Sequence, residues 1–220
     1  MKAFLYVGGT VLPERITQSP TGNDLVIAVD SGIRNARMCH ANPSVFVGDC
    51  DSFPRQQVPD DLDKIILQPE KDLTDTQAAV QVALDHGATE IYIIGGLSGR
   101  LDHTLSNLAI LERLNKLNVP SYIEDGCNRV RFLKNTSTLL ACSPYYQYLG
   151  LICLDDIAKG IEIQGCKYPL KNGKILRSHQ FAISNELTGN CALINVKKGA
   201  LYIVESADPI KKGSSREVEG

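Results

Sequence analysis

The stretch at residues 45–53, VFVGDCDSF, constrains the fold of this chain more than any other. Its first four residues are typical of a buried strand, and two aspartates, Asp49 and Asp51, follow a single glycine, Gly48. In an open α/β sheet, ligands bind in the crevice beyond the carboxyl ends of the strands. A turn after Gly48 could bring both carboxylates to one point, where magnesium would relieve their repulsion. Taken alone, the motif favours a simpler interpretation, a loop in which Asp and Ser cap a turn.

Residues 1–126 repeat this pattern of short apolar runs that end in glycine or aspartate. The runs predict strands at residues 2–7, 25–29, 45–48, 64–67, 90–94 and 121–124. Helices are predicted at residues 33–40, from about residue 75 to 87, and from 103 onward, the last with a buried stripe of Leu105, Leu108, Leu111 and Leu114. Because strands alternate with helices, we expect a Rossmann-like α/β domain with a mainly parallel sheet.

Two of the predicted helices begin with residues that suit both a helix cap and a ligand contact. Asp30 or Ser31 is expected to cap the first helix, and Asp30 could instead contact a ligand. Asp72 or Thr74 would cap the second helix, whose positive end favours Asp75. Helix N-termini also bind phosphate, so the two roles are compatible.

The segment GGLSGRLDH follows the fifth predicted strand. Glycines such as Gly95 and Gly96 let backbone N–H groups turn toward an anion, and Arg100 offers a planar fork for phosphate. Asp102 offers a further metal ligand or base, whereas His103 is interpreted as structural. The spacing matches neither the dinucleotide fingerprint nor the P-loop, but strand, glycine loop and helix together indicate an anion site.

From residue 128 onward the sequence pattern changes to short runs of alternating apolar and polar residues, which are separated by turn-forming residues. Strands are predicted at residues 129–133, 137–141, 148–154, 160–163, 180–183, 191–196 and 200–204. This spacing is typical of a β-sandwich. We therefore expect an α/β catalytic domain at residues 1–126, an all-β sandwich domain at 127–208, and a disordered tail at 209–220.

Composition narrows the classes of protein. The 220 residues carry a net charge of −2 with no basic cluster, which argues against a nucleic-acid partner. No signal peptide and no apolar run long enough for a membrane span is apparent. Seven widely spaced cysteines without a ligand pattern suit reduced thiols in the cytoplasm.

Five blocks, VGDCDS, KDLTDTQ, GGLSGRLDHTLSNL, GCKYPLKN and AISNE, occur in an order and at separations that resemble the thiamine pyrophosphokinase family. The resemblance covers about residues 25–205. It implies diphosphate transfer from ATP to thiamine, with attack of the alcohol on the β-phosphorus and release of AMP. It also implies a homodimer with thiamine bound between the first domain of one subunit and the second domain of the other.

The resemblance and the pattern of strand ends together select the expected site residues. Magnesium is expected at Asp49, Asp51, Asp75 and Asp102, and catalysis is expected from Asp75, Asp102 and Arg100. The residues expected to bind the substrates are Asp30, Gly48, Thr74, Gly95, Gly96, Arg100, Ser184 and Asn185. Some members of the family stack a tryptophan on thiamine, and this chain has none, so Tyr168, His179 and Phe181 are the candidates. The family's Asp-Gly-Gly is replaced here by Asp30-Ser31-Gly32.

Two alternatives remain open at this point. One is a pyrophosphokinase for another hydroxymethyl heterocycle, such as a pterin, because only the second domain would select the acceptor. The other is a non-catalytic nucleotide- or vitamin-binding module. Such a module would not need the full set of Asp49, Asp51, Asp75, Asp102 and Arg100.

Overall fold

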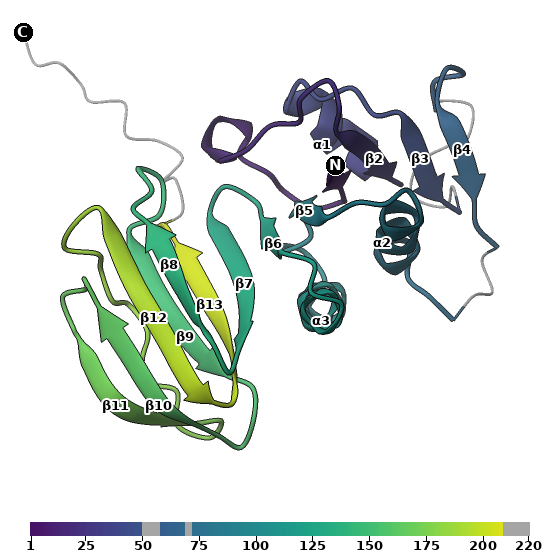
Figure 1. Cartoon of the computed structure of the whole chain (residues 1–220). Helices are drawn as coiled ribbons and strands as arrows, with labels where there is room; N and C mark the ends of the chain where they lie inside the picture. Colours follow the sequence, from purple (N-terminus) through teal and green to yellow (C-terminus); the bar gives the residue numbers. More distant parts are fainter. Residues whose placement is uncertain (50–57, 69–71, 209–220) are drawn as a thin grey trace, which may run out of the picture.

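The computed structural model describes residues 1–49, 58–68 and 72–208, and its elements form one nine-stranded and one four-stranded sheet (Figure 1). The helices are the 3-10 turn η1 (Pro13–Arg15) and α1 (Gly32–Met38), α2 (Asp75–Asp85) and α3 (Leu101–Lys116). The strands of the N-terminal part are β1 (Lys2–Tyr6), β2 (Leu25–Val29), β3 (Val45–Gly48), β4 (Asp63–Ile66), β5 (Glu90–Ile94) and β6 (Ser121–Glu124). Those of the C-terminal part are β7 (Asn128–Lys134), β8 (Ser137–Ala141), β9 (Tyr148–Cys153), β10 (Ile157–Gln164), β11 (Leu170–Leu176), β12 (Cys191–Lys198) and β13 (Ala200–Ser206).

The first six strands lie side by side in the order β4-β3-β2-β1-β5-β6, and every neighbouring pair is parallel. β1 pairs with β2 on one side and with β5 on the other, so the chain order reverses there. A crevice opens beyond the carboxyl ends of the strands at such a switch point. The predicted strands of this part are confirmed, and β2 is buried throughout, as expected for a parallel strand covered on both faces.

Helices cover both faces of the parallel strands (Figure 1). α2 and α3 pack on the face that carries Leu5 and Ile27, whereas α1 packs on the face that carries Phe4 and Tyr6. The predicted stripe of α3 is wrong at Leu105, which is 58% exposed. Its buried positions are instead Asn107, Ile110, Leu111 and Leu114, because a helix of 3.6 residues per turn buries positions three and four apart rather than every third residue.

A tight turn joins β6 to β7 at the predicted domain boundary. The Asp125 carboxylate accepts hydrogen bonds from the N–H groups of Cys127 and Asn128, at 2.8 and 2.7 Å. Gly126 has φ +89°, and a Cβ there would lie 2.6 Å from the carbonyl oxygen of Leu12. β6 and β7 pair antiparallel, and the large sheet continues through β7, β13 and β9. The sheet is therefore mixed and runs without a break from the first part into the second.

The C-terminal part is built from two facing layers (Figure 1). The four-stranded sheet, in the order β11-β10-β12-β8, shares one apolar core with β7, β13 and β9. One strand of this part is missing from the prediction made on the sequence, and one strand that was predicted is wrong. β11 was not predicted, since its sequence LKNGKIL is largely polar and only Ile175 is fully buried. Residues 180–183 do not form a strand, although the Leu151 N–H donates to the Ala182 carbonyl at 2.7 Å.

A buried group of charges lies where the two parts meet. Arg129 pairs with Glu205 through two hydrogen bonds of 2.8 and 3.0 Å, and the two side chains are 9% and 7% exposed. Arg131 also pairs with Glu205. The fully buried Glu124 accepts hydrogen bonds from Thr17. It is also the direct cross-strand partner of Arg129 in the antiparallel pair of β6 and β7. Burial raises the pKa of Glu124 despite these bonds. We call Arg129, Arg131, Glu124 and Glu205 the seam.

Within the described ranges, no helix is long and apolar enough to cross a membrane. Six cysteines lie in the same ranges, and all are free thiols. Asp51 and the expected tail at residues 209–220 lie outside the described residues.

Candidate functional site

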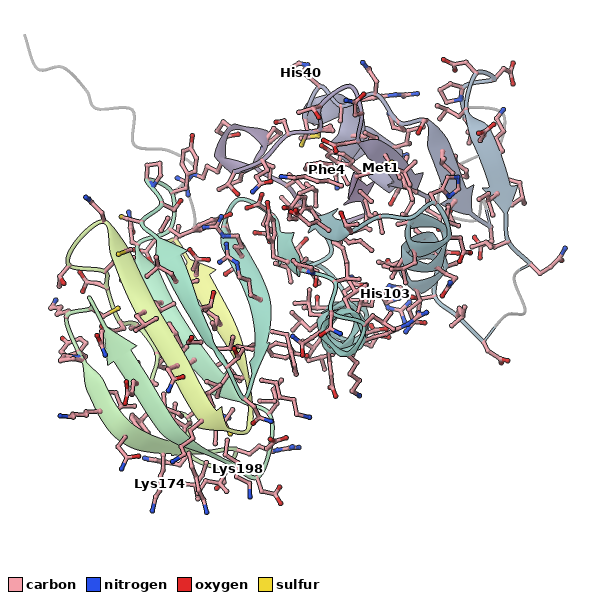
Figure 2. The ribbon with its side chains drawn as sticks, viewed as in Figure 1. Met1, Phe4, His40, His103, Lys174 and Lys198 are labelled. Carbon is pink, nitrogen blue, oxygen red and sulfur yellow. The ribbon has the colours of Figure 1, made fainter. Side chains whose placement is uncertain are left out.

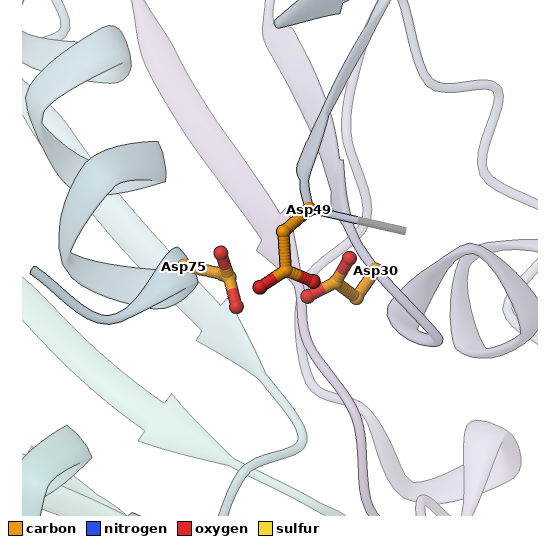
Figure 3. Close-up of side chains that lie close together, drawn as sticks. All are labelled: Asp30, Asp49 and Asp75. Atoms are coloured by element: carbon orange, nitrogen blue, oxygen red, sulfur yellow. The ribbon is translucent and has the colours of Figure 1, made fainter. Parts of the chain in front are cut away.

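Three aspartates, two that follow the ends of β2 and β3 and one that begins α2, meet in the crevice beyond β2 and β3 (Figure 3). One carboxylate oxygen from each of Asp30, Asp49 and Asp75 lies within 4.8 Å of the other two. Asp49 and Asp75 were expected to bind metal, and Asp30 was expected to bind a substrate. The structure therefore places Asp30 beside the two expected metal ligands, and the sequence pattern did not predict this grouping of three aspartates.

Asp30 is held by the local backbone at the end of β2. Its φ is +46°, a left-handed conformation that aspartate tolerates better than most residues, and its N–H donates to the Val47 carbonyl at 3.0 Å. The side chain is 8% exposed and lies against Gly48. A Cβ at residue 48 would lie 1.9 Å from Asp30 Oδ1, so only glycine there leaves room for this carboxylate. Ser31 occupies the N-cap of α1 and makes no side-chain capping bond, so the alternative in which Ser31 caps this helix is wrong.

Asp75 is placed by the start of α2. Thr74 caps the helix, because its hydroxyl accepts from the Gln77 N–H at 3.2 Å while the Gln77 side chain accepts from the Thr74 N–H at 3.0 Å. This capping box fixes the first turn, and Asp75 is its first residue. The positive end of the helix stabilises a carboxylate at that place. The predicted cap at Thr74 is confirmed, and Asp72 is exposed.

The three carboxylates fit a divalent cation. Two anions about 4 Å apart repel by about 4 kcal/mol at an effective dielectric constant near 20, and three such groups repel further. Hard oxygen donors of this kind are the ligands that Mg²⁺ and Ca²⁺ prefer, and Mg²⁺ completes its shell with water and phosphate oxygens. The space that Gly48 leaves beside Asp30 lets the ligand oxygens converge.

Two glycine pairs form the neighbouring wall of the crevice, after β1 and after β5. Gly96 donates its N–H to the Gly8 carbonyl at 2.9 Å, which ties one loop to the other. Gly9, Gly95 and Gly96 have φ values of +100°, +99° and +75°. A Cβ at Gly95 would lie 2.8 Å from the Val7 carbonyl oxygen, so the loops approach more closely than side chains would allow.

Two adjoining cavities of about 250 and 190 Å³ open between these loops and the first turns of the helices. The larger reaches Arg100, and the smaller reaches Asp30 and Asp75. Both are lined by Val7, Gly8, Ser31, Thr76, His103 and Asn107.

His103, labelled in Figure 2, was interpreted as structural but lines both cavities from α3. Thr76, Ser98 and Ser106 also line the cavities and were not selected from the sequence. The signal for them was weak, since each is a small polar residue inside a block chosen for its aspartates or glycines.

Arg100 and Asp102 form an exposed ion pair at the start of α3. Arg100 Nη2 lies 2.6 Å from Asp102 Oδ2, and the side chains are 74% and 63% exposed. The hydrogen bond from Arg100 lowers the pKa of Asp102 to about 2. Asp102 is not a member of the three-carboxylate group, so its expected metal contact stays a prediction.

A separate pocket of about 150 Å³ lies in the C-terminal part. Its walls include Tyr168, Phe181 and Ile183, which are 60%, 47% and 54% exposed. Asn185 is buried beside it, donating to the Tyr168 carbonyl at 2.8 Å and accepting from the Tyr168 N–H at 2.9 Å. Ser184 is exposed with φ +56°. The two expected thiamine contacts thus differ, because Asn185 holds the Tyr168 backbone while Ser184 faces outward.

Comparisons with known proteins agree with this organisation. Two family models match, described as thiamin pyrophosphokinase, catalytic domain, at residues 17–123 and vitamin B1 binding domain at residues 136–201, and together they span well over half of the chain. The Bacillus subtilis protein named thiamine pyrophosphokinase is 28% identical over 217 residues, which is 94% of this chain and 100% of that protein.

Solved structures share the whole fold. The crystal structure of thiamine pyrophosphokinase from Bacillus subtilis matches with a TM-score of 0.84 at 25% identity, covering 95% of this chain and 100% of that one. The structure named thiamin pyrophosphokinase from Geobacillus thermodenitrificans matches with a TM-score of 0.82 at 27% identity, covering 96% and 99%. The chain belongs to the thiamine pyrophosphokinase family.

Proposed function

We propose that this chain transfers a diphosphate group from ATP to the hydroxyl of thiamine, yielding thiamine diphosphate and AMP. Membership of the family supports this activity. The observation that carries it in the molecule is the meeting of Asp30, Asp49 and Asp75 in a glycine-walled crevice, because carboxylates and backbone N–H groups are what a cation and a polyphosphate need together.

The reaction forms a bond between the thiamine hydroxyl oxygen and the β-phosphorus of ATP, and it breaks the bond from that phosphorus to the oxygen it shares with the α-phosphate. AMP leaves with that oxygen, and the hydroxyl proton passes to a carboxylate or to water. Such transfers depend mainly on positioning and on neutralising charge. Arg100 at the mouth of the larger cavity would orient phosphate oxygens, and Asp75 or Asp102 would orient the hydroxyl.

Magnesium is the proposed cation, held by Asp30, Asp49 and Asp75, with Asp51 and Asp102 as further expected ligands. When bound, it would neutralise phosphate charge. The residues expected to hold the nucleotide are Gly48, Thr74, Gly95 and Gly96. This assignment is supported by the positions of Thr74 and Gly96, which line the crevice, and by Gly48, which makes room for the Asp30 carboxylate.

The pocket beside Tyr168 and Phe181 is the proposed thiamine site of the second domain, with Ser184 at its rim and Asn185 beneath it. In a homodimer, this pocket of one subunit would face the crevice of the other. The exposure of Tyr168 and Phe181 supports that arrangement, because large rings that stay accessible are typical of ligand and subunit contacts.

The two family models, which match on either side of residue 126, support the division into two domains. Six free cysteines support a cytoplasmic location.

The test is AMP release from magnesium-ATP by the purified chain, with and without thiamine. Thiamine-dependent release of one AMP per thiamine diphosphate would establish the reaction. No release from protein that is folded by circular dichroism would contradict it. Hydroxymethyl-pterin in place of thiamine serves as the matched acceptor and should not support release.

A further inference from the structure

Asn35 lies on α1, is 6% exposed, and uses its side-chain amide on the loop that follows β1. Its Nδ2 donates to the Val7 carbonyl at 2.7 Å and to the Gly9 carbonyl at 3.0 Å. Both protons of one amide nitrogen are thereby directed at carbonyl oxygens two residues apart. The same nitrogen lies 3.3 Å from where a Cβ of Gly95 would be, so Asn35 also occupies the space beside the second glycine loop.

Asn107 performs the corresponding task from α3. It is 7% exposed, and its Nδ2 donates to the Gly96 carbonyl at 3.0 Å. A Cβ on Gly96 would lie 2.6 Å from that nitrogen, so the amide fills the space a side chain would take. The bond from Gly96 N–H to the Gly8 carbonyl links the loop held by Asn107 to the loop held by Asn35.

These bonds fix which way the peptide groups of the loops face. The carbonyl oxygens of both loops point to interior donors, and a trans peptide is planar, so the N–H of the following residue points the opposite way. The N–H groups of Gly8 and Leu97, which follow the Val7 and Gly96 carbonyls, therefore point away from the two amides. The Thr10 N–H, which follows the Gly9 carbonyl, donates to Ser98 Oγ at 2.7 Å and so ties the first loop to the second. Backbone N–H groups turned outward in this manner bind anions, whereas outward carbonyl oxygens would repel them.

We propose that Asn35 and Asn107 are positioning residues, which hold the two glycine loops in the orientation that binds the phosphates of ATP. The inference rests on the proposed function for the identity of the anion. Neither residue needs to touch the reacting atoms, since each acts through the peptide groups of the loops.

The experiment replaces each asparagine by leucine, which has nearly the same size but no donor. The affinity for magnesium α,β-methylene-ATP, measured by calorimetry, should fall about tenfold in Asn35→Leu and in Asn107→Leu. The KM for ATP should rise by a similar factor, while the KM for thiamine should change less than about twofold. Asn195→Leu is the matched control, because its amide also donates to a glycine carbonyl, that of Gly160 at 3.5 Å, but in the sandwich. It should leave ATP affinity unchanged.

Unchanged affinity for the analogue in folded Asn35→Leu and Asn107→Leu would overturn the proposal, as would an equal rise in both KM values. Asn107→Ser and Asn35→Ser, whose hydroxyls are too short to reach the loops, guard against loss of the fold and should show the same tenfold effect. If the serine variants also unfold, the residues serve the fold itself and the proposal is wrong. A wild-type chain that binds the analogue but makes no AMP with thiamine would defeat the proposed function and leave the positioning role to be judged on affinity alone.

Discussion

The crevice of the N-terminal part and the pocket of the C-terminal part are lined by different kinds of groups. The crevice presents carboxylates and glycine backbone at the ends of parallel strands, with Asp30 almost fully buried. The pocket presents exposed rings, Tyr168 and Phe181, on loops of an antiparallel sandwich. The shape of the crevice therefore depends on backbone geometry, whereas that of the pocket depends on exposed side chains. Substitutions in the crevice should therefore abolish most of the activity, whereas substitutions in the pocket should weaken ligand affinity only moderately.

The largest expected effect is at the carboxylates. Asp49→Asn should lower kcat by about 10³-fold or more, equivalent to about 4 kcal/mol, because it removes a cation ligand that neutralises phosphate charge. Its thermal unfolding midpoint should stay the same or rise, since one of three mutually repelling charges is gone. AMP release and a thermal melt measure the two. Asp85→Asn, at the exposed far end of α2, is the control, and wild-type turnover in Asp49→Asn would refute the metal assignment.

The second effect concerns the seam, which joins the two parts. Arg129→Met should lower the free energy of unfolding by about 3 kcal/mol, because among the described residues it leaves Arg131 as the remaining ion-pair partner of the buried Glu205 carboxylate. Urea denaturation followed by circular dichroism measures the change. Lys116→Met removes an exposed ion pair with Glu112 and should leave the midpoint unchanged. An Arg129→Met chain as stable as wild type would show that the two parts do not depend on this pair.

The sequence could predict those elements whose local pattern agrees with their final surroundings. Apolar runs such as β2 became buried parallel strands, and the Thr74 cap formed because both partners of the capping box lie within four residues. β11 could not be predicted, because a polar edge strand is defined by its pairing with β10, which no local pattern encodes.

The same limit applies to the candidate site. Asp49 and Asp75 could be selected because each follows a strand or opens a helix. The grouping of Asp30 with them depends on a positive φ and on the space beside Gly48, both of which arise only when β2 and β3 pair. Asn35 and Asn107 could not be assigned a role, because a buried amide is identified by the carbonyl oxygens it meets. Long-range contacts supply this part of the site.

The third prediction tests the pocket. Tyr168→Ala should raise the KM for thiamine about tenfold, about 1.4 kcal/mol, because it removes a ring that can stack on the positively charged thiazolium or on the neutral pyrimidine of thiamine. The KM for ATP should not change. Steady-state kinetics with each substrate varied measure both, and Leu139→Ala, another exposed apolar side chain of the sandwich, is the control. A rise in the KM for ATP instead would contradict the separation of the two sites.

The smallest effect is expected from the pH dependence of Asp102. Its folded-state pKa is lowered to about 2 by Arg100, so the ion pair favours the folded state above the ordinary aspartate pKa near 4, and this contribution is lost as pH falls through about 2. Because the pair is well exposed, Asp102→Asn should not measurably move the unfolding midpoint at pH 7.

Turnover, in contrast, tests the catalytic role expected for Asp102. Its carboxylate is charged throughout pH 5–9, so it contributes no titration to the pH–rate profile in that range, and Asp102→Asn should alter the height of the profile but not its shape. Arg100→Gln, which removes the cause of the lowered pKa, should leave the shape unchanged as well, since an ordinary aspartate is also ionised above pH 5. A step in the wild-type profile that disappears in Asp102→Asn would mean that the ion pair opens when substrates bind and that Asp102 then lies beside other negative charge. Asp102 would in that case lie close to Asp30, Asp49 and Asp75 during the reaction. The exposed ion pair at the start of α3 would then be part of the same site as the three carboxylates.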